Sequence, residues 1–471
     1  MIAMTARAPD SLARHFGRTV ALAVPIILAR AALVVMFSVD TLMVGRISPE
    51  DLAYFGLGVA PQLTLMLIGV GALQASSVLT AQAIGAGRIA EVGNVFRTSI
   101  AHALAMGVAV LGLSLLAGPF FLAVGQAPDL AAGAATVSLA FGAGMPGTLL
   151  FIACNLFMES TGRPKTGMAI MLGANLVNVP LNLVFGFGWG GLVPPMGADG
   201  VMLASSIART AAGVTIAGVL VVSALRIDNF RILSFDSSRG PGLAGLVCLF
   251  RSPEAAGLRR MGLPMGLAQG VESAAFATVV MFAGLIGTVE LAAYQTTMTL
   301  VTLTFMMAIG TAGATAIRVG RAYGETRSTD MRIAGWAGIA LGGLWPLPVA
   351  ICFLVSPETA ARLVTDDPVT VAAASEALFV AGLMLSVDAM MAVALGALRG
   401  MGDVWWPTML QIAAFWCVAI PVAYIGGLVM DLGAGALIGG LLAGILVSLA
   451  GLLWRFHRAT RGKACNVAGR T

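Results

Sequence analysis

The sequence predicts an all-α polytopic membrane protein, with twelve transmembrane helices in two pseudo-symmetric six-helix lobes around a central cavity. Hydrophobic residues make up 58% of its 471 positions and charged residues only 10%, with a mean hydropathy of +0.94. A soluble domain has about 25% charged residues. The apolar runs are long enough to cross about 30 Å of hydrocarbon as helices, and they lack the alternation of membrane strands.

Twelve apolar segments follow one another along the chain. The first has basic residues before it but no small-residue cleavage site, so we expect a retained helix rather than a signal peptide. Glycine and proline inside the segments are compatible with membrane helices, because neighbouring helices satisfy the freed backbone groups. The predicted spans cover 19–43, 52–84, 98–122, 134–158, 166–188, 200–225, 261–285, 290–317, 333–355, 370–398, 405–428 and 433–454.

The lysine and arginine residues predict the direction of each span. With both termini in the cytoplasm, 23 of the 27 basic residues fall in cytoplasmic segments. Only Arg46 and Arg362 fall in outer loops, and Arg30 and Arg209 lie within spans. This bias agrees with the positive-inside rule. We therefore expect a multi-pass protein of a bacterial inner membrane.

The two halves of the chain resemble each other. Shifting residues 22–88 by 239 positions, without a gap, places Pro25 on Pro264 and Gly71 on Gly310. We expect an N-terminal lobe at 1–226, a cytoplasmic linker at 227–260, a C-terminal lobe at 261–456 and a basic tail at 457–471. Parallel repeats of this kind suit alternating access around a central cavity. The alternative is chance similarity between apolar helices.

Three carboxylates lie within predicted spans: Asp40, Glu272 and Asp388. A charged group at the bilayer centre costs about 2.5–3.5 kcal/mol, so such residues face a cavity or a partner. Glu272 follows Arg260 by 12 residues and Asp388 precedes Arg399 by 11, which puts both acids roughly 16–18 Å deep. We expect this pair to exchange a proton or to bind Na⁺ as a coupling site. A hydrogen bond between helices is the structural alternative.

Other side chains in the same spans suggest a surface for amphiphilic cations. Tyr294 and Met298 form a stripe beside Gln295, and Met384 and Met391 share a face with Asp388. Aromatic rings, thioethers and a few polar groups suit varied organic cations. Ordinary core packing is the alternative for each of these side chains.

Two asparagines in the fifth span need a polar partner. Asn178 and Asn182 flank Pro180, and Asp40 in the same lobe is a candidate for that partner. We therefore expect these three residues to lie together.

No motif indicates an enzyme or a cofactor site. The chain has no P-loop, GxSxG or HExxH sequence, and its five cysteines and three histidines are dispersed. The formal charge of +5 resides in loops and does not indicate nucleic-acid binding. Energy for transport is therefore expected from an ion gradient, with Na⁺ or H⁺ as the coupling ion.

Several motifs, in order and on the expected spans, resemble the MATE (multidrug and toxic compound extrusion) family, especially its NorM-type branch. They are Val39-Asp40-Thr41-Leu42-Met43-Val44-Gly45, the run from Gly262 through Glu272 and Gly287 to Gln295, Arg318-Val319-Gly320-Arg321, Val387-Asp388-Ala389 and the run from Gly396 to Asp403. The resemblance implies Na⁺- or H⁺-coupled drug export.

The same resemblance implies roles for individual residues. Asp40, with Asn178 and Asn182 near it, would belong to a first-lobe cation or proton network, and Glu272 and Asp388 would form a second-lobe cation site. Gln295, Asp366 and Asp367 match positions that contact cationic drugs. Met384 departs from the family pattern, because an aromatic residue can stand there, and this puts a preference for Na⁺ over H⁺ in doubt.

The sequence thus predicts an antiporter that exports small organic cations and amphiphilic drugs, is monomeric, contacts membrane lipid and needs no cofactor beyond the coupling ion. Within the same superfamily, a lipid-linked oligosaccharide flippase is the alternative. Its pyrophosphate substrate would need a basic cavity, to which Arg30 and Arg209 are the candidates. A membrane-embedded enzyme would need a nucleophile or a metal cluster, and an ion channel would conduct without exchange.

Overall fold

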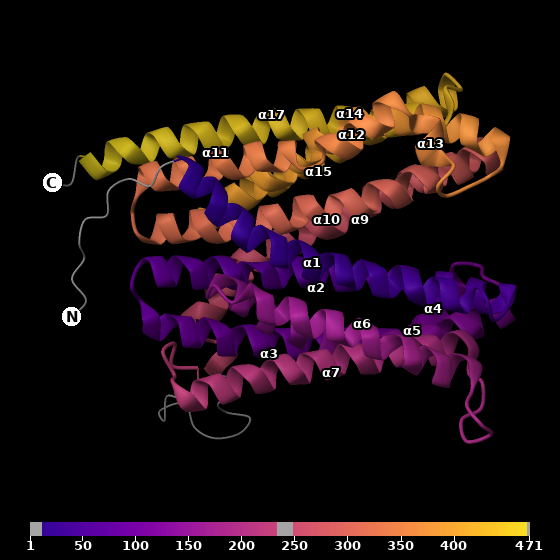
Figure 1. Ribbon diagram of the computed structural model, residues 1–471, viewed down its shortest axis with the longest axis horizontal. Coiled ribbons are helices and arrows are strands. Elements are labelled where there is room, and N and C mark those ends of the chain that lie inside the picture. Colours follow the sequence, from indigo (N-terminus) through magenta and orange to yellow (C-terminus); the bar gives the residue numbers. More distant parts are fainter. Residues whose placement is uncertain (1–11, 233–247, 469–471) are drawn as a thin grey trace. The chain divides into compact units, whose positions relative to one another are not determined.

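The computed structural model describes residues 12–232 and 248–468, and it confirms twelve helical spans. Parts of the predicted linker and tail, residues 233–247 and 469–471, lie outside the described residues. The elements, coloured along the chain in Figure 1, are α1 (Leu12–Val44), α2 (Pro49–Gly85), α3 (Ile89–Ser114), α4 (Ala117–Ala123), α5 (Pro128–Ser160), α6 (Pro164–Phe187), α7 (Gly197–Arg226), α9 (Pro253–Ile286), α10 (Thr288–Gly324), α11 (Ser328–Leu344), α12 (Leu347–Val355), α13 (Pro357–Ala361), α14 (Pro368–Gly400), α15 (Trp405–Ala414), η2 (Phe415–Ala419), α16 (Ile420–Tyr424), η3 (Ile425–Val429) and α17 (Gly433–Ala468).

Three of the predicted spans are interrupted helices. The third divides into α3 and α4, and the ninth divides into α11 and α12 next to Pro346. The eleventh alternates α-helix with the π-helical turns η2 and η3, around Pro421. Proline has no N–H and blocks a regular helical hydrogen bond, and π-turns accommodate the irregularity. Apolar composition predicted these spans but not their interruptions.

The described residues divide into two compact units. Residues 28–84, 88–232 and 248–270 form what we call the N-terminal unit, and residues 12–27, 85–87 and 271–468 form the C-terminal unit. Each unit therefore includes the beginning of the first long helix of the other half of the sequence. In the C-terminal unit, for example, Thr19 on α1 accepts a hydrogen bond from Arg318 on α10.

The sequence repeat is visible in how the fourth span of each half ends. Helices α5 and α14 each have 33 residues, and each is followed by a glycine with positive φ, Gly162 at 85° and Gly402 at 81°. The next N–H returns to an equivalent carbonyl, from Arg163 to Met158 at 2.8 Å and from Asp403 to Leu398 at 3.1 Å. This left-handed ending favours glycine, which has no Cβ.

An acidic residue at the start of the second span caps the sixth span in each half. Oδ1 of Asp51 on α2 accepts the Ala198 N–H of α7 at 2.8 Å, and Oε2 of Glu290 on α10 accepts the Ala434 N–H of α17 at 2.5 Å. The first N–H groups of a helix have no partner within the helix, so a carboxylate stabilises them. The two caps anchor α7 and α17, and α7 contributes to the site described below.

Small residues bring the helices of the N-terminal unit into close contact. A Cβ on Gly213 of α7 would collide with the Gly147 carbonyl of α5, and a Cβ on Gly58 of α2 would collide with α5 near Ala134. Close approach through glycine is typical of membrane helices, where association depends on packing. It places α5 beside α2 and α7.

Candidate functional site

A buried polar cluster surrounds Asp40 in the N-terminal unit. The Asp40 carboxylate, on α1, is fully buried and accepts hydrogen bonds from Nδ2 of Asn182 on α6, at 2.8 Å, and from the Ser205 hydroxyl on α7. Nδ2 of Asn178 donates to the same hydroxyl at 2.7 Å. Two helices, α6 and α7, therefore provide polar groups around the carboxylate of α1, as a charge within a span requires.

The two asparagines reach this cluster because they lie one helical turn apart on α6. Residues at i and i+4 share a face of a helix, and the amides of Asn178 and Asn182 also bond each other at 3.2 and 3.3 Å. The structure thus brings together the three residues that the sequence assigned to the first-lobe network. Their part in coupling remains a prediction.

The cluster also contains Arg209, whose position near Asp40 the sequence did not reveal. Arg209 is 3% exposed on α7, its charge acts on Asp40, and its Nε donates to the Ser205 carbonyl oxygen at 3.1 Å. Its guanidinium lies over the rings of Phe37 and Phe141, 5.0 and 4.9 Å from their centroids. A buried arginine needs such partners. The sequence feature that could have pointed to this position is the presence of an arginine within a predicted span.

A second buried ion pair in the N-terminal unit joins Arg30 and Glu159. Glu159 is 2% exposed near the end of α5, and a guanidinium nitrogen of Arg30 on α1 lies 3.9 Å from its Oε1. Nδ2 of Asn155, one turn earlier on α5, donates to the same oxygen at 2.6 Å. Sequence reasoning left Arg30 without a partner and placed Glu159 beyond the span that ended at 158, because span ends are poorly defined by hydropathy.

In the C-terminal unit, Glu272 on α9 and Asp388 on α14 interact electrostatically. Asp388 is 8% exposed and Glu272 is half-buried. The charge of Arg399, near the end of α14, also acts on Glu272. A helical side chain leans toward the helix N-terminus, which directs Arg399 back along α14. Two carboxylates therefore lie near each other and Arg399 acts on one of them, Glu272, an arrangement that suits binding of a monovalent cation.

The predicted drug-contact residues of α10 and α14 differ in their exposure. Gln295 is exposed and Met298 is partly buried. Tyr294, Met384 and Met391 are each 1% exposed and pack in the core of the C-terminal unit. A substrate could reach these three side chains only after the helices separate, so their role as contacts remains a prediction.

Asp366 and Asp367 lie on the exposed loop before α14. Oδ2 of Asp367 accepts hydrogen bonds from the Thr370 hydroxyl at 2.6 Å and the Thr370 N–H at 2.9 Å, capping the helix. These bonds lower the pKa of Asp367, so it remains ionised well below neutral pH. Asp367 thus has a structural role in addition to any contact with a drug.

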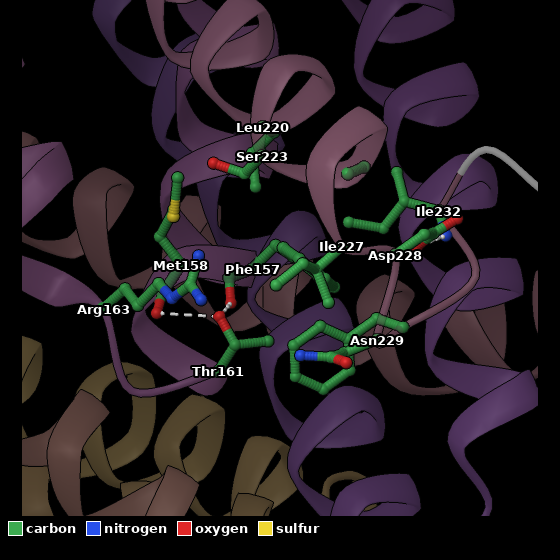
Figure 2. A pocket seen from close by; sticks show the side chains of 12 residues that line it. Phe157, Met158, Thr161, Arg163, Leu220, Ser223, Ile227, Asp228, Asn229 and Ile232 are labelled. Atoms are coloured by element: carbon green, nitrogen blue, oxygen red, sulfur yellow. Dashed lines mark hydrogen bonds between the residues drawn. The ribbon is translucent and has the colours of Figure 1, made fainter.

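A half-open pocket lies where the chain leaves α7, and it contains none of the predicted site residues. Figure 2 shows its lining, with the Thr161 hydroxyl bonded to the carbonyl oxygens of Phe157 at 2.9 Å and Met158 at 3.2 Å. The Ile232 N–H donates to Oδ1 of Asp228 at 2.7 Å. The pocket has mostly apolar walls and internally satisfied polar groups, so we assign it no function.

The chain is similar in sequence to a known protein family and to individual members of it. The family described as MatE matches residues 25–184 and 264–425, which include all five predicted coupling residues. A Caulobacter vibrioides protein named "Probable multidrug resistance protein NorM" is 32% identical over 438 residues, which cover 93% of this chain and 90% of that protein. A protein of the same name from Acinetobacter baylyi is 30% identical, covering 92% and 94%.

The fold is also found among solved structures. The crystal structure of the eukaryotic MATE transporter AtDTX14 superimposes with a TM-score of 0.83, covering 97% of this chain and all of that one. The two sequences are 18% identical, so this likeness concerns the fold alone. Twelve helices in two halves are therefore common to chains of very different sequence.

Proposed function

The chain belongs to the MatE family, and from that premise we propose that it is a cation-coupled antiporter that exports cationic and amphiphilic drugs and toxic organic compounds across the bacterial inner membrane by alternating access. The observation that carries the proposal is the pair formed by Glu272 and Asp388 in the C-terminal unit, two acids that act on each other while Arg399 acts on Glu272. The multidrug resistance proteins named above support the substrate class.

Antiport follows from the charge of this pair. Two ionised carboxylates repel each other, so the pair binds a proton, Na⁺ or an organic cation favourably. A drug and a coupling ion that neutralise the same acids cannot both do so at once. Binding of the ion from the outer side therefore promotes release of the drug. Alternating access by the two repeats exposes the site to one side of the membrane at a time.

We also propose the membrane orientation, the oligomeric state and the cofactor requirement of the transporter. We place both termini in the cytoplasm because of the arginine and lysine distribution. We propose a monomer that requires no cofactor beyond Na⁺ or H⁺. A lipid-linked oligosaccharide flippase is less well supported, because a basic site for pyrophosphate needs uncompensated arginines, whereas Arg30 and Arg209 each neighbour a buried acid.

The test is transport by purified protein in liposomes, with an ethidium-type dye as substrate. Dye movement is measured with only a Na⁺ gradient, and then with only a proton gradient. We expect movement under at least one of them, and its loss in Glu272→Gln and Asp388→Asn, because each change removes a carboxylate of the cation site.

The matched control is Glu376→Gln, which removes an exposed acid from the same helix as Asp388 and should leave transport unchanged. Size-exclusion chromatography checks that all variants are folded. Movement under neither gradient, or full exchange by both site variants, would refute the proposal.

A further inference from the structure

The buried ion pair of the N-terminal unit repeats, with reversed polarity, a pair in the C-terminal unit. A shift of 240 residues places Glu159 on Arg399, and both precede the same glycine-terminated ending described above, at Gly162 and Gly402. Each residue is therefore at the same turn of the fourth span in its half. One half has an acid there and the other has a base.

The partners on the first span of each half are reversed in the same way. A shift of 239 residues places Arg30 on Gln269, and Glu272 follows Gln269 by three residues. Positions i and i+3 of a helix share a face. Arg30 pairs with Glu159 at 3.9 Å, and Glu272 interacts with Arg399. In each half, one face of the first span therefore has a charge opposite in sign to the charge at the end of the fourth span.

The charge balance of the two units differs as a result. In the described part of the N-terminal unit, the buried acids are Asp40 and Glu159, and each has its own guanidinium partner. In the C-terminal unit, Arg399 acts on Glu272, and the charge that acts on Asp388 is that of Glu272. A tethered guanidinium cannot leave its carboxylate as a mobile ion does. The N-terminal acids are thus each compensated, whereas the two C-terminal acids outnumber the one guanidinium that acts on them.

Arg30 is the charged group that acts on Glu159. Charged side chains on the other helices near α5 have their own contacts or lie at helix ends. Arg97 on α3 donates to the Arg231 and Ile232 carbonyl oxygens, and Asp199 on α7 accepts from Thr136. The others are Glu50, Asp51, Glu91, His102, Lys165, Arg209 and Arg226.

We propose that Arg30 is a tethered counter-ion that withholds Glu159 from exchange with mobile cations, and thereby sets how many coupling cations the protein takes up. This inference rests on the proposed antiport. Arg30 replaces, at Glu159, the mobile ion that the C-terminal acids bind. Removing the guanidinium leaves a buried carboxylate without a counter-charge, which then takes up a proton or Na⁺, because an isolated charge in a span is unstable.

The experiment counts cations bound by purified protein in detergent. Proton uptake is measured by potentiometric titration between about pH 9 and about pH 5, and binding of radioactive Na⁺ is measured at about pH 9. We expect Arg30→Gln to bind one more cation per chain than the wild type. We expect Arg30→Gln combined with Glu159→Gln to match the wild type, because the uncompensated acid is gone. Arg30→Lys keeps the tethered charge and should also match.

Equal cation counts for Arg30→Gln and for the double variant would overturn the inference. If Arg30→Gln is not monodisperse, the exchanged pair Arg30→Glu with Glu159→Arg replaces it. A wild-type count for the exchanged pair supports a tethered counter-ion, and a changed count overturns it. These counts need no drug transport, so the inference can fail while dye export by the wild type succeeds, and the reverse also holds.

Discussion

At the scale of single residues, the buried charges of this chain are defined by their partners. Asp40 has two hydrogen-bond donors and Arg209, whereas Glu159 has Asn155 and Arg30. Removing one member of a buried pair leaves the other charge uncompensated, which costs more than removing both. A single substitution should therefore destabilise the protein more than the corresponding double substitution.

Arg209→Gln should lower the free energy of unfolding by about 3 kcal/mol, because it leaves Asp40 without its counter-charge in the N-terminal unit. Adding Asp40→Asn should restore part of the loss, since neither charge remains. Thermal unfolding in detergent, followed by tryptophan fluorescence, measures both effects.

Arg226→Gln, at the exposed end of the same helix, is the control and should leave the unfolding temperature unchanged. An unaltered unfolding temperature in Arg209→Gln would contradict this role for the arginine. So would a double variant that is less stable than the single one.

At the scale of helices, the two halves have a helix-capping carboxylate at the same position, although the capping residues differ. Asp51 caps α7 and Glu290 caps α17, so a shorter and a longer carboxylate perform the same task. The preceding glycines, Gly197 and Gly433, have φ of 63° and 68°, and a Cβ on either would contact the capping carboxylate. The cap and the glycine therefore form one structural unit in each half.

Asp51→Ala and Glu290→Ala should each reduce stability by about 1 kcal/mol, the usual effect of losing a helix cap. Asp51→Asn should retain most of the stability, because its amide oxygen still accepts the Ala198 N–H. Glu50→Ala, at the exposed neighbouring position, is the control. Unfolding temperatures of the four variants in one detergent test this, and equal values for Asp51→Ala and Glu50→Ala would exclude a cap that stabilises the protein.

At the scale of the whole molecule, the orientation in the membrane follows from the distribution of basic residues. Loops between odd and even spans, counted from the N-terminus, are poor in arginine and lysine, and those between even and odd spans are rich in them. The loop before α7 contains Leu192, which is 89% exposed, and the turn after α2 contains the exposed Ala86. These two positions should lie on opposite sides of the membrane.

In a variant whose five cysteines are replaced by alanine, Leu192→Cys should react with an impermeant maleimide added to intact spheroplasts. Ala86→Cys should react only after the membrane is permeabilised, because the proposed topology puts this turn in the cytoplasm. Gel shifts with a maleimide reagent measure both. Labelling of Ala86→Cys from outside would reverse the proposed orientation.

The sequence by itself determined the twelve spans, the repeat, and three of the acids within spans. Each of these depends on local properties: the length of an apolar run, a register between two segments, or a charge within a span. It also brought Asn178 and Asn182 to one face, since helical spacing is local.

Only the tertiary structure decided the partners of the charges. Arg209 beside Asp40, Arg30 beside Glu159 and Arg399 beside Glu272 join helices that are far apart in the chain. Tertiary packing also buried Tyr294, Met384 and Met391, which helical periodicity had placed on plausible binding faces. The physical reason is that hydropathy and periodicity describe one helix at a time, whereas the energy of a buried charge depends on which neighbouring helix provides its counter-ion.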